Sequence, residues 1–401
     1  MKFLHTSDWH LGRRPVGGIG SFSDTRFNDY FQSAKWVVEK AVEERVDLIL
    51  ISGDIFDKNT ISPEVLDKTM EILKIAKDNK ITVFAIEGNH DRSFSGQSWI
   101  AFLEKMGYLK LLNSSEDTKV DHIPFKGFNF YGFPYLGVLT DKILNDFMER
   151  IETNNNILMV HTAISSSEYL PGTVDKEVID KLGRKFIYIA GGHFHSYSAY
   201  PSENPFFFIP GSPEYWDLYE RDQKGIIIYD TEIGLARFIP SKKRRVLRFE
   251  FQCKSNTEIS ENVRRLIDTD KISENDIAIL NFQVTEFDGY VNADDIEKLV
   301  QKETGALKVI VRLDYESKSV LDISNINSNK IELLEKSIIA EKWKNEFSSK
   351  ADETVRLTNA LKKILRESGP RSDIFAMVDE FLTTLLKNSG GIECEDQKDH
   401  T

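Results

Sequence analysis

Cysteine is scarce in this sequence, which limits both the cross-links it can form and the ligands it can offer to a metal ion. The two cysteines among 401 residues are Cys253 and Cys394, and they form no CxxC pair. A disulfide framework is therefore not expected. A bound metal would have to be held by His, Asp, Glu or Asn side chains, which favours Mn, Mg, Fe or Zn over a thiolate site.

Long apolar runs are also missing. No run in the sequence approaches the roughly 18 residues that a membrane-spanning helix needs. The first residues, Met1 to His5, lead into the chain without the apolar core of a signal peptide. Apolar residues make up 40% and charged residues 29% of the chain, which is ordinary for a soluble globular protein. We therefore expect a cytoplasmic protein, associated with the nucleoid if the cell is prokaryotic.

Positive charge is in deficit, because the formal net charge is −12. This balance argues against a protein coated in basic charge for nucleic acid, but it leaves room for a local DNA-binding groove. One basic run stands out, consisting of Lys242, Lys243, Arg244 and Arg245. The run fits a phosphate contact or a solvated linker between domains, and the sequence leaves both open.

What the first 240 residues do contain is a regular alternation of short apolar runs and helical patterns. Strands are expected near residues 2–6, 48–51, 81–86, 156–160, 186–190, 206–209 and 226–229. Apolar spacing predicts a helix over 29–45, and Ser62 followed by Pro63 predicts the start of another. Alternation of this kind predicts an α/β fold with a sheet covered on both faces.

The composition changes near residue 241, where a second pattern begins. Residues 241–320 predict a small domain of βαβαβ type, and residues 321–330 predict a linker rich in Asn, Ser and Asp. Amphipathic helices are expected over 331–388, and a disordered acidic tail over 389–401. The last helix carries an apolar stripe that includes Ile374, Met377, Phe381 and Leu385. That stripe could pack back on the body or dock a partner, and periodicity does not decide between them.

Polar side chains gather where the predicted strands end. Five strands are followed by two Asp, one Asn and five His, which are Asp8, His10, Asp54, Asn89, His90, His161, His193 and His195. A single histidine of this kind is more often hydrogen-bonded than a ligand, and an Asp after Gly often caps a helix. Together they form the inventory of a dinuclear metal site, because the carboxyl ends of the strands line one crevice.

These residue types suit two-metal chemistry on a phosphoester. A carboxylate can bridge two divalent cations, and neutral imidazoles can complete each shell. Ions about 3.5–4 Å apart can clamp the attacking and leaving oxygens, and no Ser or Cys nucleophile is needed. Phe194 separates His193 from His195, so an extended backbone directs the two rings apart and each can serve a different ion.

Five motifs, in this order, resemble those of the calcineurin-like metallophosphoesterases. They are DWH at 8–10, GDIFD at 53–57, GNHD at 88–91, a lone His161 after an apolar strand, and GHFH at 192–195. The run HTSDWHLG, at 5–12, further resembles the double-strand-break-repair exonucleases of the SbcD type, the nuclease partners of an SMC-like ATPase. The resemblance implies an α/β fold, a two-sheet sandwich flanked by helices, over 1–240. It also implies a DNA-binding cap at 241–320 and a helical ATPase-docking segment at 331–388.

The resemblance implies two Mn²⁺ ions per subunit, each with its own ligands. The first set would be Asp8, His10 and His195. The second set would be Asn89, His161 and His193. Asp54 would bridge the two ions. Mg²⁺ or another divalent ion could replace Mn²⁺.

Other residues of the motifs take supporting roles in this family. His90 would stand beside the scissile phosphate without binding metal, Asp91 would orient it, and Asp57 would support the site. The family's usual proline before GNHD is Glu87 here, which is expected to alter the turn without touching the metals. The chain has no GxxxxGK[ST] motif, so ATP would be bound by the partner alone.

Three functions remain in view. The first is a Mn-dependent DNA nuclease with double-strand exonuclease and single-strand endonuclease activity. The second is a phosphatase or cyclic-nucleotide phosphodiesterase on the same metal core, and the third is a scaffold for a DNA-tethering ATPase. The resemblance also implies a homodimer built from helices near 62–79 and 97–106, with exposed apolar contacts at Leu66, Met70, Phe102 and Leu103.

Overall fold

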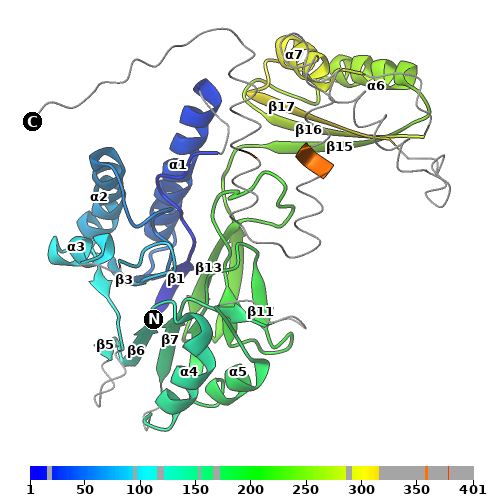
Figure 1. Ribbon diagram of the computed structural model, residues 1–401. Coiled ribbons are helices and arrows are strands. Elements are labelled where there is room, and N and C mark those ends of the chain that lie inside the picture. The colour runs from blue at the N-terminus through cyan, green and yellow to red at the C-terminus, as the bar shows by residue number, and fades with distance from the viewer. Residues whose placement is uncertain are drawn as a thin grey trace, which may run out of the picture. The chain divides into compact units, whose positions relative to one another are not determined.

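The computed structural model describes most of the chain up to Tyr315 (Figure 1). The described residues are 1–15, 20–93, 97–114, 122–151, 155–165, 172–285, 291–315, 357–359 and 378. Met1–Tyr315 and Glu316–Thr401 form two separate compact units. Several predicted features lie outside the described residues: the linker at 321–330, nearly all of 331–388, the tail at 389–401, and the stripe of Ile374, Met377, Phe381 and Leu385.

The first sheet of the larger unit has six strands. Its central strands run parallel, in the order β1 (Lys2–Thr6), β2 (Leu48–Ser52), β3 (Thr82–Ile86) and β4 (Lys110–Leu111). On the other side of β1 lie the antiparallel strands β13 (Gly225–Asp230) and β14 (Leu235–Pro240). The parallel arrangement brings the carboxyl ends of β1, β2 and β3 to the same edge.

The second sheet also has six strands, with a parallel centre and antiparallel edges. Its order is β11 (Ser198–Tyr200), β12 (Phe207–Ile209), β10 (Phe186–Ala190), β7 (Asn156–Val160), β6 (Phe128–Phe133) and β5 (Ile123–Phe125). Strands β10 and β7 are parallel neighbours, so the segments that follow them emerge side by side. A short pair, β8 (Ala163–Ile164) with β9 (Thr173–Val174), continues from the end of β7.

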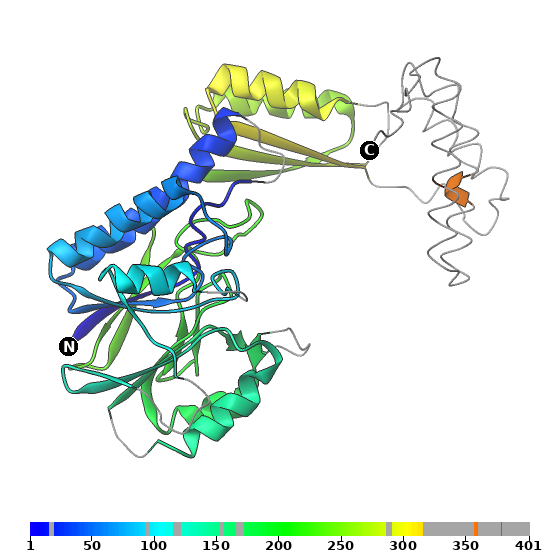
Figure 2. The same cartoon turned by 60° about the vertical axis from the view of Figure 1, so that its left-hand side comes forward.

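The two sheets pack face to face and helices cover their outer faces (Figure 2). On the first sheet lie α1 (Ser21–Glu43), α2 (Pro63–Asp78) and α3 (Trp99–Lys105). On the second lie α4 (Thr140–Met148), preceded by the 3-10 turn η1 (Gly137–Leu139), and α5 (Lys176–Leu182). Because every central strand is buried on both sides, each is an almost continuous apolar run in the sequence. This arrangement confirms the predicted two-sheet sandwich.

The pleat explains how one strand serves two cores. Phe3 and Leu50 point into the core between the sheets, whereas Leu4 and Ile49 point toward the helices. All four side chains are fully buried. Burying such side chains contributes about 1.5–3 kcal/mol each, so a double-sided strand is a strong anchor for the loop that follows it.

Two helix starts differ in how well the sequence marks them. Ser62 accepts a hydrogen bond from the Val65 backbone and Pro63 occupies the first turn, as predicted. Helix α1 begins at Ser21, eight residues before the predicted start at 29. Its first turns bury Ser23 and Arg26 in place of apolar side chains, so apolar periodicity cannot detect them.

The small domain has the predicted βαβαβ order. It consists of β15 (Val246–Cys253), α6 (Asn256–Asp268), β16 (Ile277–Val284), α7 (Ala293–Thr304) and β17 (Lys308–Tyr315). The three strands are parallel, with β16 in the centre, and one apolar core joins them to both helices. Asn292 caps α7 by accepting a hydrogen bond from the Asp294 backbone, as predicted.

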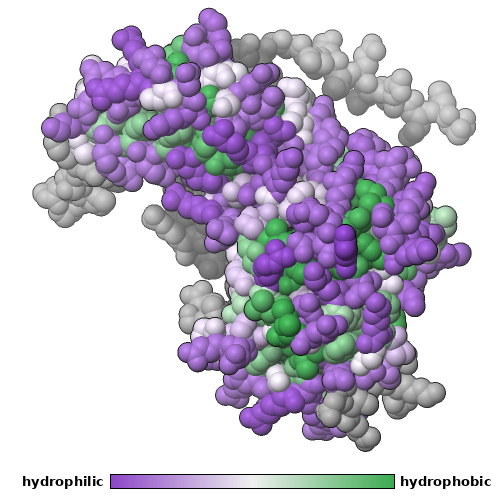
Figure 3. Space-filling model, turned by 180° about the vertical axis from the view of Figure 1, so that it is seen from behind, coloured by the Kyte–Doolittle hydropathy of each residue, from purple (hydrophilic) through white to green (hydrophobic). Residues whose placement is uncertain are grey.

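The apolar side chains predicted to mediate a dimer are less exposed than expected. Leu103 of α3 is fully buried in the core beneath the helix, so its expected exposure was wrong. Leu66, Met70 and Phe102 are partly buried, while Met106 at the end of α3 is 48% exposed. Seen from behind, the surface is mostly hydrophilic with several separate apolar patches (Figure 3). Among the described helices none has the length and apolarity to cross a bilayer.

Candidate metal centre

The predicted site residues lie in the segments that directly follow the carboxyl ends of five parallel strands. Three of these strands are in one sheet and two are in the other. Strand β1 leads to Asp8 and His10, β2 to Asp54, and β3 to Asn89 and His90. In the second sheet β7 leads to His161, and β10 leads to His193 and His195. The structure brings all eight residues together at the edge where the two sheets meet, because both sheets present the same ends of their strands there.

One group of these residues converges around Asp8. The ligand atoms of Asp8, His10 and His195 all lie within 4.8 Å of one another, and the two Nε2 atoms of the histidines are 3.1 Å apart. Both carboxylate oxygens of Asp8 are buried and find no hydrogen-bond partner among the described residues. Burial raises the pKa of Asp8. An unsatisfied buried carboxylate facing two imidazoles fits a cation, because a buried charge is retained only when it is paired.

A second group converges on the amide oxygen of Asn89. Its Oδ1 atom lies 3.1 Å from His161 Nε2 and 3.1 Å from His193 Nδ1. Asp54 lies between this group and the first, since its Oδ2 atom is 3.3 Å from His161 Nε2 and 3.8 Å from His10 Nε2. Asp54 therefore occupies the position from which one carboxylate can contact two ions. His193 and His195 belong to different groups, as predicted. The expected reason was wrong, because the backbone is not extended here: β10 ends at Ala190 and His193 has a φ angle of 75°.

The charges of the centre depend on one another. Burial by itself would raise the pKa of Asp54, but the charge of His161 and its hydrogen bond hold that pKa below its usual range. Burial would lower the pKa of His161, but the charges of Asp54 and Asp8 and the hydrogen bonds to Asp54 and the Ser52 carbonyl together raise that pKa to about 9. Burial holds the pKa of His10 well below its usual value. A cation that takes the Nε2 atom of His161 must therefore displace a proton, which couples binding to pH.

The backbone of the centre is held in unusual conformations. Asp8, His10, Asp54 and His193 have φ angles of 55°, 46°, 52° and 75°, a left-handed region that non-glycine residues rarely adopt. Such residues persist only where the surroundings determine them, and they cluster at functional sites. Gly192 has no such angle but needs its missing side chain, because a Cβ atom would collide with the Ser52 carbonyl and lie 2.9 Å from His161 Nδ1.

The GNHD turn places its last two residues differently from the expectation. The His90 ring uses Nδ1 to donate to the Asp57 carbonyl at 2.7 Å, and the His90 backbone donates to Asp54 Oδ1 at 2.9 Å. Asp91 is buried and accepts hydrogen bonds from the backbone of Gly88, Ile55 and Phe56. The expectation that Asp91 orients the His90 ring is corrected, because Asp91 ties the turns after β2 and β3 together and the Asp57 carbonyl orients the ring.

Asp57 has more contacts than a supporting role suggested. Its carboxylate accepts from Arg13 at 3.1 Å and lies 3.6 Å from His10 Nδ1. His10, Asp57 and His90 form a third cluster whose ligand atoms lie within 4.8 Å of one another. Asp57 therefore borders the Asp8 group through His10.

The sequence reasoning missed the aromatic and acidic residues that border the centre. The Trp216 ring lies 5.3 Å from the His195 ring, and the Arg13 guanidinium lies 3.6 Å above the Trp216 ring. Tyr135 lies 5.4 Å from the His193 ring, and Glu220 Oε1 lies 3.1 Å from His195 Nδ1. These residues come from loops beyond β6 and β12, where no strand periodicity or motif spacing singles them out.

The basic run at 242–245 is engaged within the protein. Arg244 forms an ion pair with Asp29 of α1 at 2.7 Å, and Arg245 forms one with Asp276 at 3.4 Å. Lys243 lies over the Tyr215 ring, and Lys242 is exposed. Arg244 therefore links α1 to the start of the small domain, whereas Lys242 and Arg245 are exposed.

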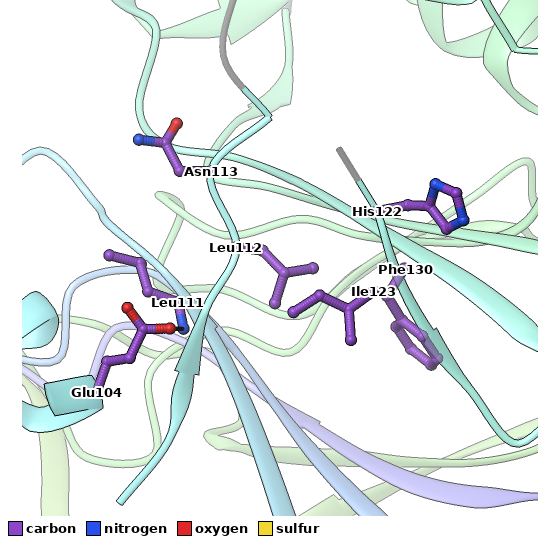
Figure 4. Close-up of a pocket in the computed structure, with 7 residues that line it drawn as sticks. All are labelled: Glu104, Leu111, Leu112, Asn113, His122, Ile123 and Phe130. Carbon is purple, nitrogen blue, oxygen red and sulfur yellow. Dashed lines mark hydrogen bonds between the residues drawn. The ribbon is translucent and has the colours of Figure 1, made fainter. Parts of the chain in front are cut away.

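A surface pocket on another part of the molecule includes none of the predicted site residues. It is lined by Glu104, Leu111, Leu112, Asn113, His122, Ile123 and Phe130 (Figure 4). Glu104 accepts a hydrogen bond from the Leu111 backbone at 2.8 Å across its edge. Its mostly apolar lining makes it a poor metal site.

Comparison with known proteins gives the centre a context. Residues 1–197 match the family described as calcineurin-like phosphoesterase. Several curated relatives bear the name DNA double-strand break repair protein Mre11. The one from Archaeoglobus fulgidus is 29% identical to this chain, and the alignment covers 59% of this chain and 54% of that protein. The proteins of that name in Saccharolobus solfataricus and Methanocaldococcus jannaschii are each 28% identical over 57% of this chain, covering 60% and 62% of their own lengths.

The similarity has clear bounds. The matched region spans less than two thirds of each of these relatives. A solved structure of the protein TT1561 of Thermus thermophilus aligns with 60% of this chain and 99% of its own, at 10% identity and a TM-score of 0.40. The matched family segment, 1–197, contains all five strand ends and all eight residues of the centre. That segment, just under half of the chain, thus carries a calcineurin-like phosphoesterase domain.

Proposed function

We propose that this chain is the metal-dependent nuclease subunit of a DNA double-strand-break repair complex. It would hydrolyse phosphodiesters as a double-strand exonuclease and a single-strand endonuclease, and would work in the cytoplasm at the chromosome. The observation that carries the proposal is the pair of ligand groups that share Asp54. The relatives named Mre11 support DNA as the substrate, since each is a repair protein by its name.

The residues present fit two divalent ions, for which Mn²⁺ is our proposal. Asp8, His10 and His195 would hold one ion. Asn89, His161 and His193 would hold the other, with Asp54 shared. Ions held in this way supply Lewis acidity to a phosphodiester and make water a nucleophile near neutral pH. Oxygen and imidazole ligands without thiolate are the donor set that suits Mn²⁺.

His90 would handle a proton at the leaving oxygen. The Asp57 carbonyl can only accept, so the Nδ1 atom of His90 must carry the hydrogen in their bond. The Nε2 atom is then the one that can hold or release a proton. The hydrogen bond from the His90 backbone to Asp54 fixes the turn relative to the shared carboxylate. His90 would thereby position the phosphate without ligating metal.

Two further modules would supply substrate and partner contacts. The small domain at 241–320 would act as a DNA-binding cap, in which Lys242 and Arg245 are the exposed members of the basic run. The segment at 331–388 would dock the coiled coil of an SMC-like ATPase, which alone would bind ATP. A homodimer would form through α2 and α3, where Leu66, Met70 and Phe102 are partly exposed, and Met106 just after α3 adds apolar surface.

The alternatives use the same centre on other substrates or for another purpose. A phosphatase or cyclic-nucleotide phosphodiesterase would need neither the small domain nor the helices at 331–388. A pure scaffold would have no use for a complete ligand set. The test is to incubate the purified chain with Mn²⁺ on linear duplex DNA and on a small phosphoester, with Asp54→Asn as the inactive control. Rapid turnover of the small ester without DNA cleavage would overturn the proposal.

A further inference from the structure

The loop between β12 and β13 contains a carboxylate, that of Glu220, which accepts a hydrogen bond from the proposed metal ligand His195. Glu220 Oε1 accepts a hydrogen bond from His195 Nδ1 at 3.1 Å, and its Oε2 accepts one from the Trp216 backbone at 3.0 Å. The Glu220 side chain is only 18% exposed. A carboxylate can only accept, so the hydrogen of this bond resides on Nδ1 of His195. The Nε2 atom, 3.1 Å from that of His10, is therefore the one that presents a lone pair to the centre.

A buried lysine contacts both the Glu220 carboxylate and the backbone of His195. Lys224 is fully buried, and its Nζ atom lies 2.9 Å from Glu220 Oε2. The same Nζ atom donates to the His195 carbonyl at 2.6 Å. A buried ammonium requires such partners, because a buried charge without them costs several kcal/mol. Lys224 thus joins the backbone of His195 to the side chain that orients its ring.

The small domain holds the backbone of the same loop. Arg248 of β15 donates from one nitrogen to the carbonyls of Leu218 and Glu220, each at 2.6 Å. From β17, two strands away, the guanidinium of Arg312 lies 3.8 Å from the Tyr219 ring. The loop from 218 to 220 is therefore in contact with His195 on one side and with strands of the small domain on the other.

From these contacts we propose that Glu220 is a positioning residue for the ion that His195 holds, and that Arg248 keeps Glu220 in place from the small domain. The inference rests on the proposed metal centre but not on its substrate. Carboxylates that accept from the second nitrogen of a ligating histidine set its tautomer and ring orientation, and losing them typically weakens metal affinity by about 10–100-fold. These contacts among the described residues connect the small domain to the ion that His195 would hold.

The test measures Mn²⁺ binding to EDTA-stripped full chain, without DNA, by calorimetry and electron paramagnetic resonance. We expect Glu220→Ala to weaken one of two ions by about 10–100-fold. Glu220→Gln, which can still accept from Nδ1, should weaken it less. Arg248→Met should weaken the same ion, and Arg248→Lys should restore part of the affinity. Glu261→Ala is the matched control, because Glu261 pairs with Arg265 at 3.4 Å in an exposed pair on α6, an element separate from the loop that carries Glu220.

A double-mutant cycle separates positioning from general structural support. If Glu220 acts through His195, then Glu220→Ala causes no further loss of affinity in a His195→Ala background. The role of Glu220 would be overturned if Glu220→Ala lowered Mn²⁺ affinity equally in the wild-type and the His195→Ala backgrounds. It would also be overturned if neither Glu220→Gln nor Glu220→Ala changed Mn²⁺ affinity. Unchanged affinity in Arg248→Met would overturn the connection to the small domain. Should Glu220→Ala not fold, Glu220→Gln alone decides.

These outcomes are distinct from those of the proposed function. A wild-type chain that binds two ions but cleaves no DNA would overturn the nuclease proposal and leave the role of Glu220 standing. If instead the wild-type chain cleaves DNA and both ions bind equally well with and without Glu220, the nuclease proposal would stand and the role of Glu220 would be overturned.

Discussion

Asn89 Oδ1 and His193 Nδ1 lie 3.1 Å apart although 104 residues separate them in the chain. The same oxygen lies 3.1 Å from His161 Nε2, so one amide gathers two histidines from the second sheet. His195, two residues beyond His193, turns instead to His10 at 3.1 Å. Neighbouring histidines of one motif are thereby divided between two ligand groups.

This division predicts that His193→Ala and His195→Ala empty different sites first. We expect each variant to lose affinity for one Mn²⁺ ion by more than about 100-fold, beyond the usual loss for an outer-shell partner, while the other ion is bound more nearly as in the wild type. Electron paramagnetic resonance during a Mn²⁺ titration distinguishes a lone ion from a coupled pair. Loss of the same ion in both variants would show that the two rings serve one site.

His90→Asn is expected to retain both ions and lose cleavage. A positioned acid or base typically contributes about 10²–10⁴-fold to the rate, so DNA cleavage should fall by that factor. Metal content is measured by elemental analysis of the purified variant, and cleavage on labelled duplex DNA. His122→Asn, at an exposed position outside the centre, is the control and should cleave normally. Metal loss in His90→Asn would instead make His90 a ligand, as its cluster with His10 and Asp57 allows.

The ion pair of Arg26 and Glu214 is expected to stabilise the region behind the centre. Glu214 Oε1 lies 3.2 Å from both terminal nitrogens of Arg26, and its Oε2 accepts from Ser33 at 3.0 Å, all within a buried space. Glu214→Ala leaves Arg26 buried with fewer partners, which should lower the free energy of unfolding by about 3–5 kcal/mol.

Urea unfolding in EDTA measures that loss. Glu261→Ala is the matched control, because Glu261 pairs with Arg265 on the surface of α6 and exposed pairs contribute less than about 1 kcal/mol. Equal effects of the two substitutions would contradict the importance of the buried pair.

His5 should make stability depend on pH. It is fully buried against Tyr188, Ser52 and Gly191, and burial lowers its pKa to about 3. Between that value and the ordinary 6.5 the unfolded chain binds a proton that the folded chain does not, so stability falls as pH decreases through this window.

One such group contributes a slope of up to about 1.4 kcal/mol per pH unit. This contribution is isolated by subtracting the free energy of unfolding of His5→Gln from that of the wild type at each pH between 6.5 and 4. The difference should correspond to the uptake of about one proton on unfolding. His122→Gln serves as the exposed control. A difference that does not change with pH would contradict the assignment.

Truncation after about residue 325 is expected to spare nuclease activity and abolish docking to an ATPase coiled coil. Met1–Tyr315 forms a compact unit by itself, so the shortened chain should keep its metal centre. Mn²⁺-dependent cleavage and co-purification with the ATPase measure the two properties. A truncated chain that fails to fold would favour packing of the apolar stripe at 374–386 against the body.

The sequence by itself determined the strands and the inventory of the centre. Strands such as Lys2–Thr6 and Leu48–Ser52 can be predicted from the sequence, because burial on both faces requires a nearly uninterrupted apolar run. The polar residues that follow them are legible because parallel strands bring the same ends to one edge. Ser62 and Asn292 mark helix starts, since a capping side chain acts within a few residues.

The tertiary structure alone decided which side chain meets which. The Asp57 backbone carbonyl orients the His90 ring in place of Asp91, because the turn directs Asp91 inward and leaves His90 beside Asp57. Leu103 proved buried, and the basic arginines proved paired with Asp29 and Asp276. Glu220 reaches His195 from a loop without any periodic signal. Such contacts join segments far apart in the chain, and local spacing carries no information about them.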